Sequence, residues 1–220
     1  MNDQQRRESG DWRNRMTEIW NKVYKSDKSF FGEEASNFAL LCFNHMKMNN
    51  VNRILELGAG HGRDSTFFAS NGIEVEALDY SIIAIELLDK ITKEKRLPIK
   101  PQIFDVKRAL PFPNGYFDAV YSHMLLNMRF SVDELHFVFS EMRRVLKPNG
   151  FNFFSVRNQN DKSYSEGVQI DKGIYDISGF QVQFFTEEEI RDLTKGFEIL
   201  CIAEEYEEPV TLYLVFTNKL

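Results

Sequence analysis

The sequence of 220 residues has few cysteines and no long apolar run. Cys42 and Cys201 are its only cysteines, too few for the disulfide framework of a small secreted domain, and we expect both to be buried free thiols in a reducing cytoplasm. No apolar run approaches the roughly 20 residues that span a bilayer, and none follows the basic residues near the start. The sequence therefore predicts a cytoplasmic protein without a membrane anchor.

Basic charge and metal-ligand patterns are scarce as well. The 27 Lys and Arg are outnumbered by 33 Asp and Glu, which gives a net charge of -6. A nucleic-acid binder usually carries a basic stripe, so we expect no nucleic-acid partner. No Cys-x-x-Cys, His-x-x-x-His or EF-hand pattern occurs, so we expect no metal.

What the chain does have is a regular alternation of strand and helix patterns after two N-terminal helical patterns. Strands are expected over residues 52–58, 73–79, 100–106, 116–123 and 151–157, with helices over 62–72, 81–96 and from 131 to about 146 between them. This alternation is typical of a mostly parallel sheet with helices on both faces. Two last strand patterns, 197–206 and 210–218, are joined by a link too short for a parallel crossover, so the sheet should end in an antiparallel hairpin.

One segment breaks the alternation. Residues 158–185 are polar and rich in aromatic side chains, and they show no clear periodicity. About 28 such residues far exceed the usual connection of about 4 to 6, and long loops of this kind tend to be lids, binding loops or disordered segments. We call residues 158–185 the lid segment and expect it to cover a ligand.

The most informative stretch is "ILELGAGHGRD", where Gly58, Gly60 and Gly62 follow an apolar strand. Glycines there allow a tight turn and close approach of a ligand to the backbone, at the carboxyl end of the strand where open parallel sheets bind ligands. A dinucleotide site is the main alternative, but its G-x-G-x-x-G fingerprint requires glycine where this chain has Arg63.

Two acids, Glu56 and Asp105, separate the two interpretations, and a third is common to both. Asp79, at the end of the second strand, can accept from ribose hydroxyls in either case. Glu56 would repel a pyrophosphate but attract an ammonium group. Asp105 can accept from the amino group of an adenine. A ligand with adenine, ribose and an ammonium but no phosphate is S-adenosylmethionine, which we therefore expect as the cofactor.

Five ordered motifs carry a family resemblance: "ELGAGHGR", "LDYS", "FDV", "LPFPNGYFDAVYSH" and "EMRRVLKPNG". Together they resemble class I S-adenosylmethionine-dependent methyltransferases, in particular the small-molecule group of methyltransferase type 11 and tellurite-resistance proteins. The resemblance covers about residues 54–157. It implies a Rossmann-like doubly wound α/β fold with a seven-stranded sheet, and one domain over residues 1–220. Its parts would be an N-terminal helical cap (1–50), a cofactor-binding core (51–157), the lid segment (158–185) and a C-terminal helix and hairpin (186–220).

The resemblance also implies site residues and products. Cofactor-binding residues would be Glu56, Gly58, Ala59, Gly60, Asp79, Tyr80, Ser81, Asp105, Val106, Ser122 and His123. The cofactor would leave as S-adenosylhomocysteine after methyl transfer to a small-molecule acceptor, and the protein would be a monomer or a homodimer. A module that binds S-adenosylmethionine without catalysis, or a regulator that senses it, remains the alternative.

The acceptor side is less constrained by the sequence. His123 is a candidate base because its unperturbed pKa lies near neutrality, although it can equally well pack over the cofactor or bond to the backbone. Candidate acceptor contacts come from the N-terminal aromatic group, with Tyr24 and Phe31, and from the lid segment and its base, with Tyr164 and Arg157.

Overall fold

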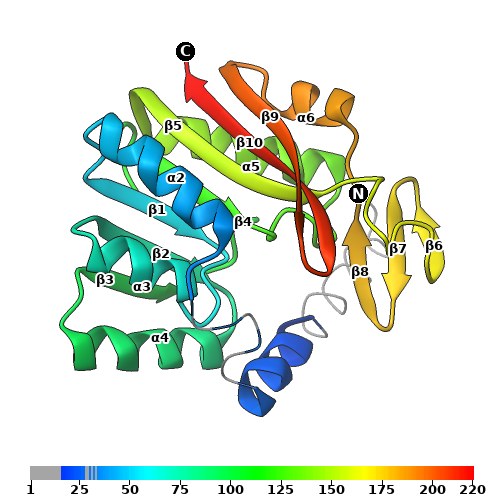
Figure 1. The fold of residues 1–220 in the computed structure, drawn as a ribbon, viewed down its shortest axis with the longest axis horizontal. Helices are drawn as coiled ribbons and strands as arrows, with labels where there is room; N and C mark the ends of the chain where they lie inside the picture. The colour runs from blue at the N-terminus through cyan, green and yellow to red at the C-terminus, as the bar shows by residue number, and fades with distance from the viewer. Residues whose placement is uncertain (1–15, 28–29, 31, 33) are drawn as a thin grey trace.

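The computed structural model describes residues 16–27, 30, 32 and 34–220. Its central feature is a seven-stranded sheet with the strand order β3-β2-β1-β4-β5-β10-β9 (Figure 1). The parallel strands are β1 (Arg53–Leu57), β2 (Glu74–Asp79), β3 (Ile99–Ile103), β4 (Phe117–His123) and β5 (Leu146–Arg157). The antiparallel pair is β9 (Phe197–Glu207) and β10 (Val210–Lys219). The predicted doubly wound sheet with a terminal hairpin is confirmed.

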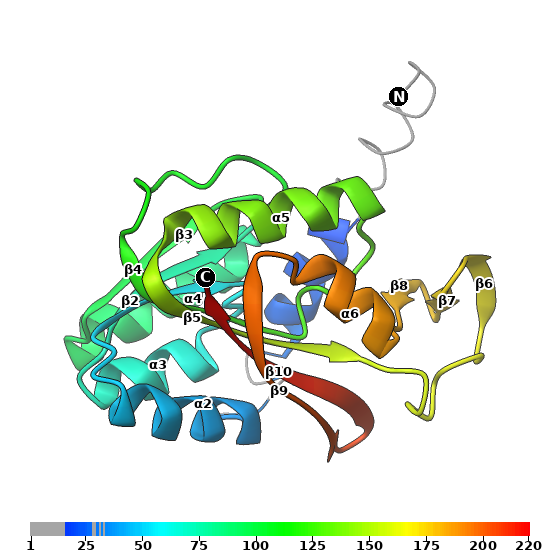
Figure 2. The same ribbon diagram turned by 90° about the horizontal axis from the view of Figure 1, so that it is seen from above.

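Helices cover both faces of this sheet (Figures 1 and 2). On one side lie α2 (Asn37–Met48), α3 (Arg63–Ser70) and α4 (Ile82–Lys95), and on the other α5 (Val132–Val145) and α6 (Glu187–Leu193). Each face has its own apolar cluster, one that includes Phe38, Phe68 and Leu88 and one that includes Phe139 and Phe154. The sheet is thus buried on both sides, as near-continuous apolar strands require.

Two helices begin where the sequence predicts. Ser131 and Glu134 form a reciprocal capping box at the start of α5, and Thr186 and Glu189 form another at the start of α6. In each box a side-chain oxygen satisfies a backbone N–H that has no partner inside the helix. These local bonds fix the two helix starts independently of the tertiary packing.

The lid segment contains a second sheet that the sequence analysis did not predict. Its antiparallel strands are β6 (Val168–Asp171), β7 (Ile174–Ile177) and β8 (Phe180–Gln183). Each strand has only four residues, too few for an alternating pattern to stand out. Two-residue turns join them, with Gly173 and Gly179 in their second positions at φ +72° and +90°, as tight hairpins require. In the sequence, the glycines of the two turns were the signal for this small sheet, because the strands are too short to give one.

Two smaller expectations are corrected. Strand β5 begins at Leu146 instead of Phe151, because the "KPNG" stretch read as a turn after the helix is part of the strand. Cys201 is exposed rather than buried, whereas Cys42 is buried as expected. Cys201 lies on β9, the last strand at one edge of the sheet, where fewer elements cover the side chains.

A helical segment over residues 16–26 precedes α2 and lies beside the lid segment (Figure 1). The Trp20 ring packs on Phe180 of β8 with a centroid distance of 5.6 Å. Ser81, the N-cap of α4, donates a hydrogen bond to the Asn21 side chain at 2.7 Å. Residues 1–15 of the predicted N-terminal cap lie outside the described residues. Within the described part of the chain, no helix is long and apolar enough to cross a membrane.

The turn before α3 generates a stability prediction. Gly62 caps α3 at φ +87°, and a Cβ there would lie 2.1 Å from Cδ1 of the fully buried Leu88. Gly62→Ala should therefore combine the cost of a left-handed residue, roughly 1–2 kcal/mol, with an overpacking cost of about 1–3 kcal/mol. Urea denaturation measures the sum.

Gly72→Ala is the matched control for that variant. Gly72 has φ +88°, but a Cβ there would meet nothing within 4 Å, so only the backbone cost should appear. Equal losses of unfolding free energy in the two variants would contradict the packing of Leu88 against the turn.

Candidate active site

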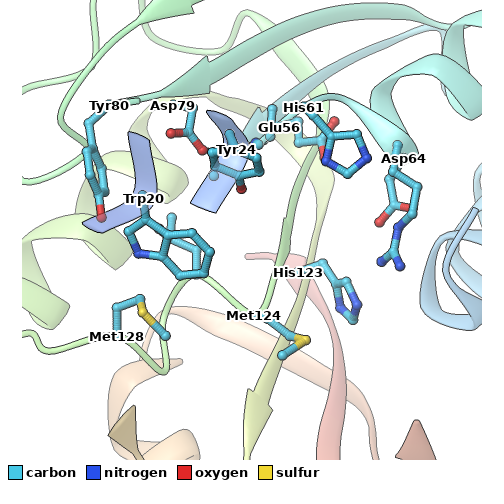
Figure 3. A pocket seen from close by; sticks show the side chains of 15 residues that line it. Trp20, Tyr24, Glu56, His61, Asp64, Asp79, Tyr80, His123, Met124 and Met128 are labelled. Carbon is cyan, nitrogen blue, oxygen red and sulfur yellow. Dashed lines mark hydrogen bonds and ion pairs between the residues drawn. The ribbon is translucent and has the colours of Figure 1, made fainter. Parts of the chain in front are cut away.

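Two adjoining cavities open where β1, β2 and β4 end, at the carboxyl edge of the parallel strands. The first, of about 90 Å³, is lined by Trp20, Tyr24, Glu56, Gly58, Ala59, Gly60, His61, Arg63, Asp64, Asp79, Tyr80, His123, Met124, Leu125 and Met128 (Figure 3). The second, of about 250 Å³, is lined by Met16, Thr17, Tyr80, Asp105, Val106, Lys107, Leu125, Met128, Arg129 and Phe130. They share Tyr80, Leu125 and Met128, so together they form one elongated site.

The glycine turn after β1 forms the floor of the first cavity. Gly60 has φ +56°, and a Cβ there would lie 2.6 Å from the hydroxyl oxygen of Tyr24. Only glycine leaves room for that hydroxyl. The helix over residues 16–26 thus closes directly onto the turn, and Tyr24 is buried there.

Glu56 is buried in strand β1 beside the turn and accepts a hydrogen bond from Ser65 of α3. Burial, and then the negative charge of Asp64, raise the pKa of Glu56 to about 8. The side chain is therefore largely protonated at neutral pH until a positive group approaches it.

Asp64, in the first turn of α3, is the most heavily bonded carboxylate of the site. It accepts from the Ser36 backbone at 2.9 Å, from the Ser36 hydroxyl at 2.9 Å and from the Tyr121 hydroxyl at 2.7 Å. Burial alone would raise the pKa of Asp64, but the adjacent Arg63 and these donors bring it below its ordinary value. Asp64 therefore carries a fixed negative charge that ties α2, α3 and β4 together.

Asp79 ends strand β2 and holds the other side of the glycine turn. Its two oxygens accept from the backbone N–H groups of Gly60 at 2.9 Å and Ser81 at 2.8 Å. Burial nevertheless raises the pKa of Asp79 above its ordinary value. The carboxylate lies between the turn and α4, where it can also accept from a ligand's hydroxyl groups.

The second cavity has a different chemistry. Asp105 and Val106 follow β3, and Phe130 closes the cavity from the loop before α5. Lys107 is held away by an ion pair with Glu134 at 2.7 Å, and its ammonium lies over the Phe130 ring. Arg129, also in the lining, donates to the Gln181 side chain at 2.8 Å. Most of the other walls are apolar, and Asp105 is the only carboxylate in the lining, which suits a flat heterocycle with an amino group.

His123 ends strand β4 and has a neighbour at each ring nitrogen. Nδ1 lies 2.7 Å from the Ser155 hydroxyl, which also accepts from the Met124 backbone N–H at 3.0 Å. Nε2 is 3.5 Å from Glu207 of β9, a distance that suits an ion pair but does not meet the geometry of a hydrogen bond. Burial would raise the pKa of Glu207, but His123 and Arg63 bring it below its ordinary value.

His61, inside the glycine turn, is the second histidine of the first cavity. Its Nε2 lies 3.0 Å from the Gly32 carbonyl oxygen, and its ring packs 6.0 Å from the Tyr24 ring. The side chain is only 8% exposed. Burial, the largest influence, lowers the pKa of His61.

Most predicted cofactor-binding residues line the cavities, but several predicted residues do not. Ser81 is a buried N-cap, and Ser122 is fully buried with no hydrogen-bond partner for its hydroxyl among the described residues. Arg157 pairs with Asp161 at 2.7 Å and lies over the Phe184 ring. Tyr164 packs on Tyr175 and Phe184 in the core of the lid segment. Phe31 lies outside the described residues.

Other residues of the site received no role from the sequence. His61, Arg63 and Asp64 lie inside the glycine motif, and Met124 directly follows the predicted His123, so their positions in the sequence offered a signal. Glu207 offered none, because it reaches His123 through the pairing of β9 beyond β10 and β5.

The residues fit S-adenosylmethionine on several observations. The turn leaves no room for side chains at its three glycines, the buried Glu56 can pair with a positive group, and the adjoining slot carries Asp105. Arg63 is already paired with Asp64, so it is not free to hold a pyrophosphate. No group of three or more His, Cys, Asp or Glu among the described residues could hold a metal ion.

Comparison with known proteins agrees with this geometry. A family model described as a methyltransferase domain matches residues 54–150. The curated demethylmenaquinone methyltransferase of Renibacterium salmoninarum is 37% identical over 98 residues, which are 44% of this chain and 38% of that protein. The chain therefore matches well under half of that relative's length.

Solved structures share the fold over more of the chain. An S-adenosylmethionine-dependent methyltransferase from Methanosarcina mazei has a TM-score of 0.71 at 23% identity, covering 81% of this chain and 97% of its own. The Burkholderia thailandensis 1,6-didemethyltoxoflavin-N1-methyltransferase, solved with its acceptor and S-adenosylhomocysteine, has a TM-score of 0.76 at 16% identity, covering 96% and 89%. These matches show that residues 54–150 carry a methyltransferase domain and that the chain has the fold of S-adenosylmethionine-dependent methyltransferases.

Proposed function

We propose that the protein transfers the methyl group of S-adenosylmethionine to a small-molecule acceptor. The observation that carries this proposal is the elongated site itself, in which a turn with glycine at positions 58, 60 and 62 and a buried, protonatable Glu56 adjoin a largely apolar slot with Asp105. Ammonium, ribose and adenine each have a matching partner along its length. Glu56 would face the ammonium, Asp79 the ribose and Asp105 the adenine amino group.

The cofactor supplies an activated methyl group on a positively charged sulfur. The chain's task is then to align the acceptor with that methyl and to keep water out. Trp20, Met124 and Met128 give the first cavity a wall of large apolar side chains, and the Trp20–Phe180 contact joins the N-terminal helix to the lid segment. These elements would enclose the acceptor.

Enclosure of this kind favours a small acceptor over a macromolecule. The cavities are bounded by the helix over residues 16–26 and by the loop from Met124 to Phe130, and Phe180 of the lid segment packs on Trp20 without lining either cavity. A relative named for demethylmenaquinone and a fold neighbour solved with a toxoflavin precursor both take ring-shaped small molecules by name, which supports this acceptor class. The exposed free Cys201 suits a reducing compartment, so we place the reaction in the cytoplasm.

A binding module without catalysis is the alternative class. Incubating the purified protein with metabolite extracts and S-adenosylmethionine labelled in its methyl group tests the proposal directly, because the product is the compound that gains the label. Tight binding of S-adenosylhomocysteine without labelling of any compound above a protein-free control would favour the binding module.

Asp79 should be essential for cofactor affinity. Asp79→Ala removes charge-assisted hydrogen bonds worth about 1.5–3 kcal/mol, so S-adenosylhomocysteine should bind roughly 10- to 150-fold more weakly by calorimetry. NAD should bind negligibly to the unaltered protein.

Asp118→Ala serves as the control for Asp79. Asp118 also accepts two backbone N–H groups, those of Asn52 and Arg53, but it lies near the start of β4, away from both cavities. An equal loss of affinity in both folded variants would remove Asp79 from the site, and NAD binding tighter than S-adenosylhomocysteine would contradict the cofactor.

Cofactor binding should also release a proton. At pH 7 Glu56 is largely protonated because its pKa is about 8, and an arriving ammonium favours its charged form. Affinity for S-adenosylhomocysteine should therefore increase as pH rises towards 8 and level off above it. Calorimetry at pH 7 in two buffers of different ionisation enthalpy measures the released proton directly.

Glu56→Gln isolates this effect, since Gln can still accept from Ser65 but cannot ionise. Proton release should fall in that variant. Equal proton release in the unaltered protein and in Glu56→Gln would show that the proton comes from another group.

The lid segment and the N-terminal helix should respond to ligands together. Because Trp20 packs on Phe180, binding should slow amide hydrogen exchange in residues 16–26 and 174–183 at the same time. Trp20→Ala should weaken this joint protection, whereas Phe137→Ala, on the outer surface of α5, should not. Exchange that is equally fast with and without cofactor and acceptor would refute a lid.

A further inference from the structure

We propose that His61, rather than His123, takes the proton that the acceptor loses. The inference rests on the proposed function and narrows the acceptor to small molecules whose nucleophilic atom carries a hydrogen, either a hydroxyl or an N–H. It starts from the hydrogen bonds of the two histidines in the first cavity, which leave different ring nitrogens available.

The partner of His61 fixes its tautomer. A carbonyl oxygen can only accept, so at 3.0 Å from the Gly32 oxygen Nε2 must carry the proton and donate it. In the neutral ring the lone pair is then on Nδ1. None of the described residues bonds to Nδ1, Nδ1 is not among the fully buried atoms that lack a partner, and His61 lines the first cavity.

The surroundings of His61 keep the ring neutral. Arg63 disfavours the charged ring, while Asp64, Asp27 and the Gly32 carbonyl favour it. Burial exceeds all of these, and the pKa lies below the ordinary 6.5. At neutral pH His61 is therefore unprotonated at Nδ1 and able to accept a proton.

His123 is arranged in the opposite way. The Ser155 hydroxyl already accepts from the Met124 N–H, and Nδ1 of His123 is the one acceptor that the described residues offer to its own proton. Nδ1 is therefore occupied, and Nε2 carries the ring proton beside the Glu207 carboxylate. His123 is held as a donor next to a negative charge, with no free lone pair.

The position of His61 suits the role. It lies in the glycine turn between Gly60 and Gly62, and it shares the first cavity with Glu56, Tyr24 and Met124. Figure 3 shows its ring beside Tyr24, with His123 reaching the same cavity from β4. A base carried on this turn stays close to the bound cofactor, because the same turn is the floor of the cofactor site.

The transfer balances with this assignment. The acceptor atom forms its bond to the methyl carbon as the carbon–sulfur bond breaks, and that electron pair remains on sulfur. The proton of the acceptor's O–H or N–H moves to Nδ1 of His61. The resulting imidazolium returns the proton to water when the site opens.

The test uses the full chain with ¹⁵N-labelled histidine and S-adenosylhomocysteine as the probe. Calorimetric binding comes first, because absent binding contradicts the proposed function whatever the state of His61. In the saturated protein, two-bond ¹⁵N–¹H spectra identify the protonated nitrogen of each of the four histidines. His61→Gln assigns the His61 signals by removing them, and Gln still offers an N–H to the Gly32 carbonyl. His136→Gln, on the exposed side of α5, is the matched control.

We expect the His61 proton on Nε2 at pH 7, with Nδ1 titrating below 6.5. Diethyl pyrocarbonate, which modifies unprotonated imidazole nitrogens, should modify His61 of the ligand-free protein faster than His123 and than His45, whose Nε2 is buried, as read by peptide mass mapping. A proton on Nδ1 of His61, or modification no faster than at His123, overturns the proposal even where S-adenosylhomocysteine binds.

With the acceptor found by labelling, His61→Gln should lower kcat by about 10²- to 10⁴-fold while S-adenosylhomocysteine affinity stays unchanged. His136→Gln should keep full activity. An acceptor without a proton to lose, such as a thioether or a tertiary amine, would also overturn the inference.

Discussion

The whole site depends on the absence of side chains at two positions of one turn. At Gly60 the missing Cβ admits the Tyr24 hydroxyl, and at Gly62 it admits Leu88 of α4. The first contact lets the N-terminal helix close onto the cofactor cavity, and the second fixes α4 against the start of α3. The same turn carries His61 between these two glycines. Binding, closure and the proposed proton transfer therefore all depend on the same few residues.

Carboxylates that lie close together in the site differ in protonation state because their surroundings differ. Asp64 is surrounded by donors and stays charged, while Glu56, with one donor and with Asp64 as a neighbour, holds a proton until a cation arrives. Like charges in one site are pushed towards different protonation states in this way. A permanently charged Glu56 would destabilise the ligand-free protein, because its buried charge would have no cation beside it. A protonatable Glu56 needs to ionise only when the ammonium is there to compensate.

How much the sequence could predict follows from the range of each interaction. The sheet, the helix caps and the residues of the glycine turn arise from local patterns, so the core over 51–157 and residues such as Asp79 and Asp105 could be placed in advance. The strands of the lid segment were too short to show a pattern. Arg157 was expected at the acceptor but pairs with Asp161, and Glu207 was not expected but lies beside His123. Both depend on tertiary neighbours that spacing along the chain does not reveal.

The contrast between local patterns and tertiary contacts also separates the residues that the chain shares with its relatives from those that would set its acceptor specificity. The family model covers residues 54–150, which include the glycine turn, Asp79 and Asp105 but neither the N-terminal helix nor the lid segment nor Glu207. The N-terminal helix reaches the first cavity through Tyr24. The lid segment is linked to it through the Trp20–Phe180 contact, and Glu207 through its neighbour His123. Under the proposed function the shared core binds the cofactor, so contacts from outside the core would select the acceptor. Under this proposal the choice of acceptor rests on Trp20 and Tyr24 of the N-terminal helix, which line the first cavity together with His61.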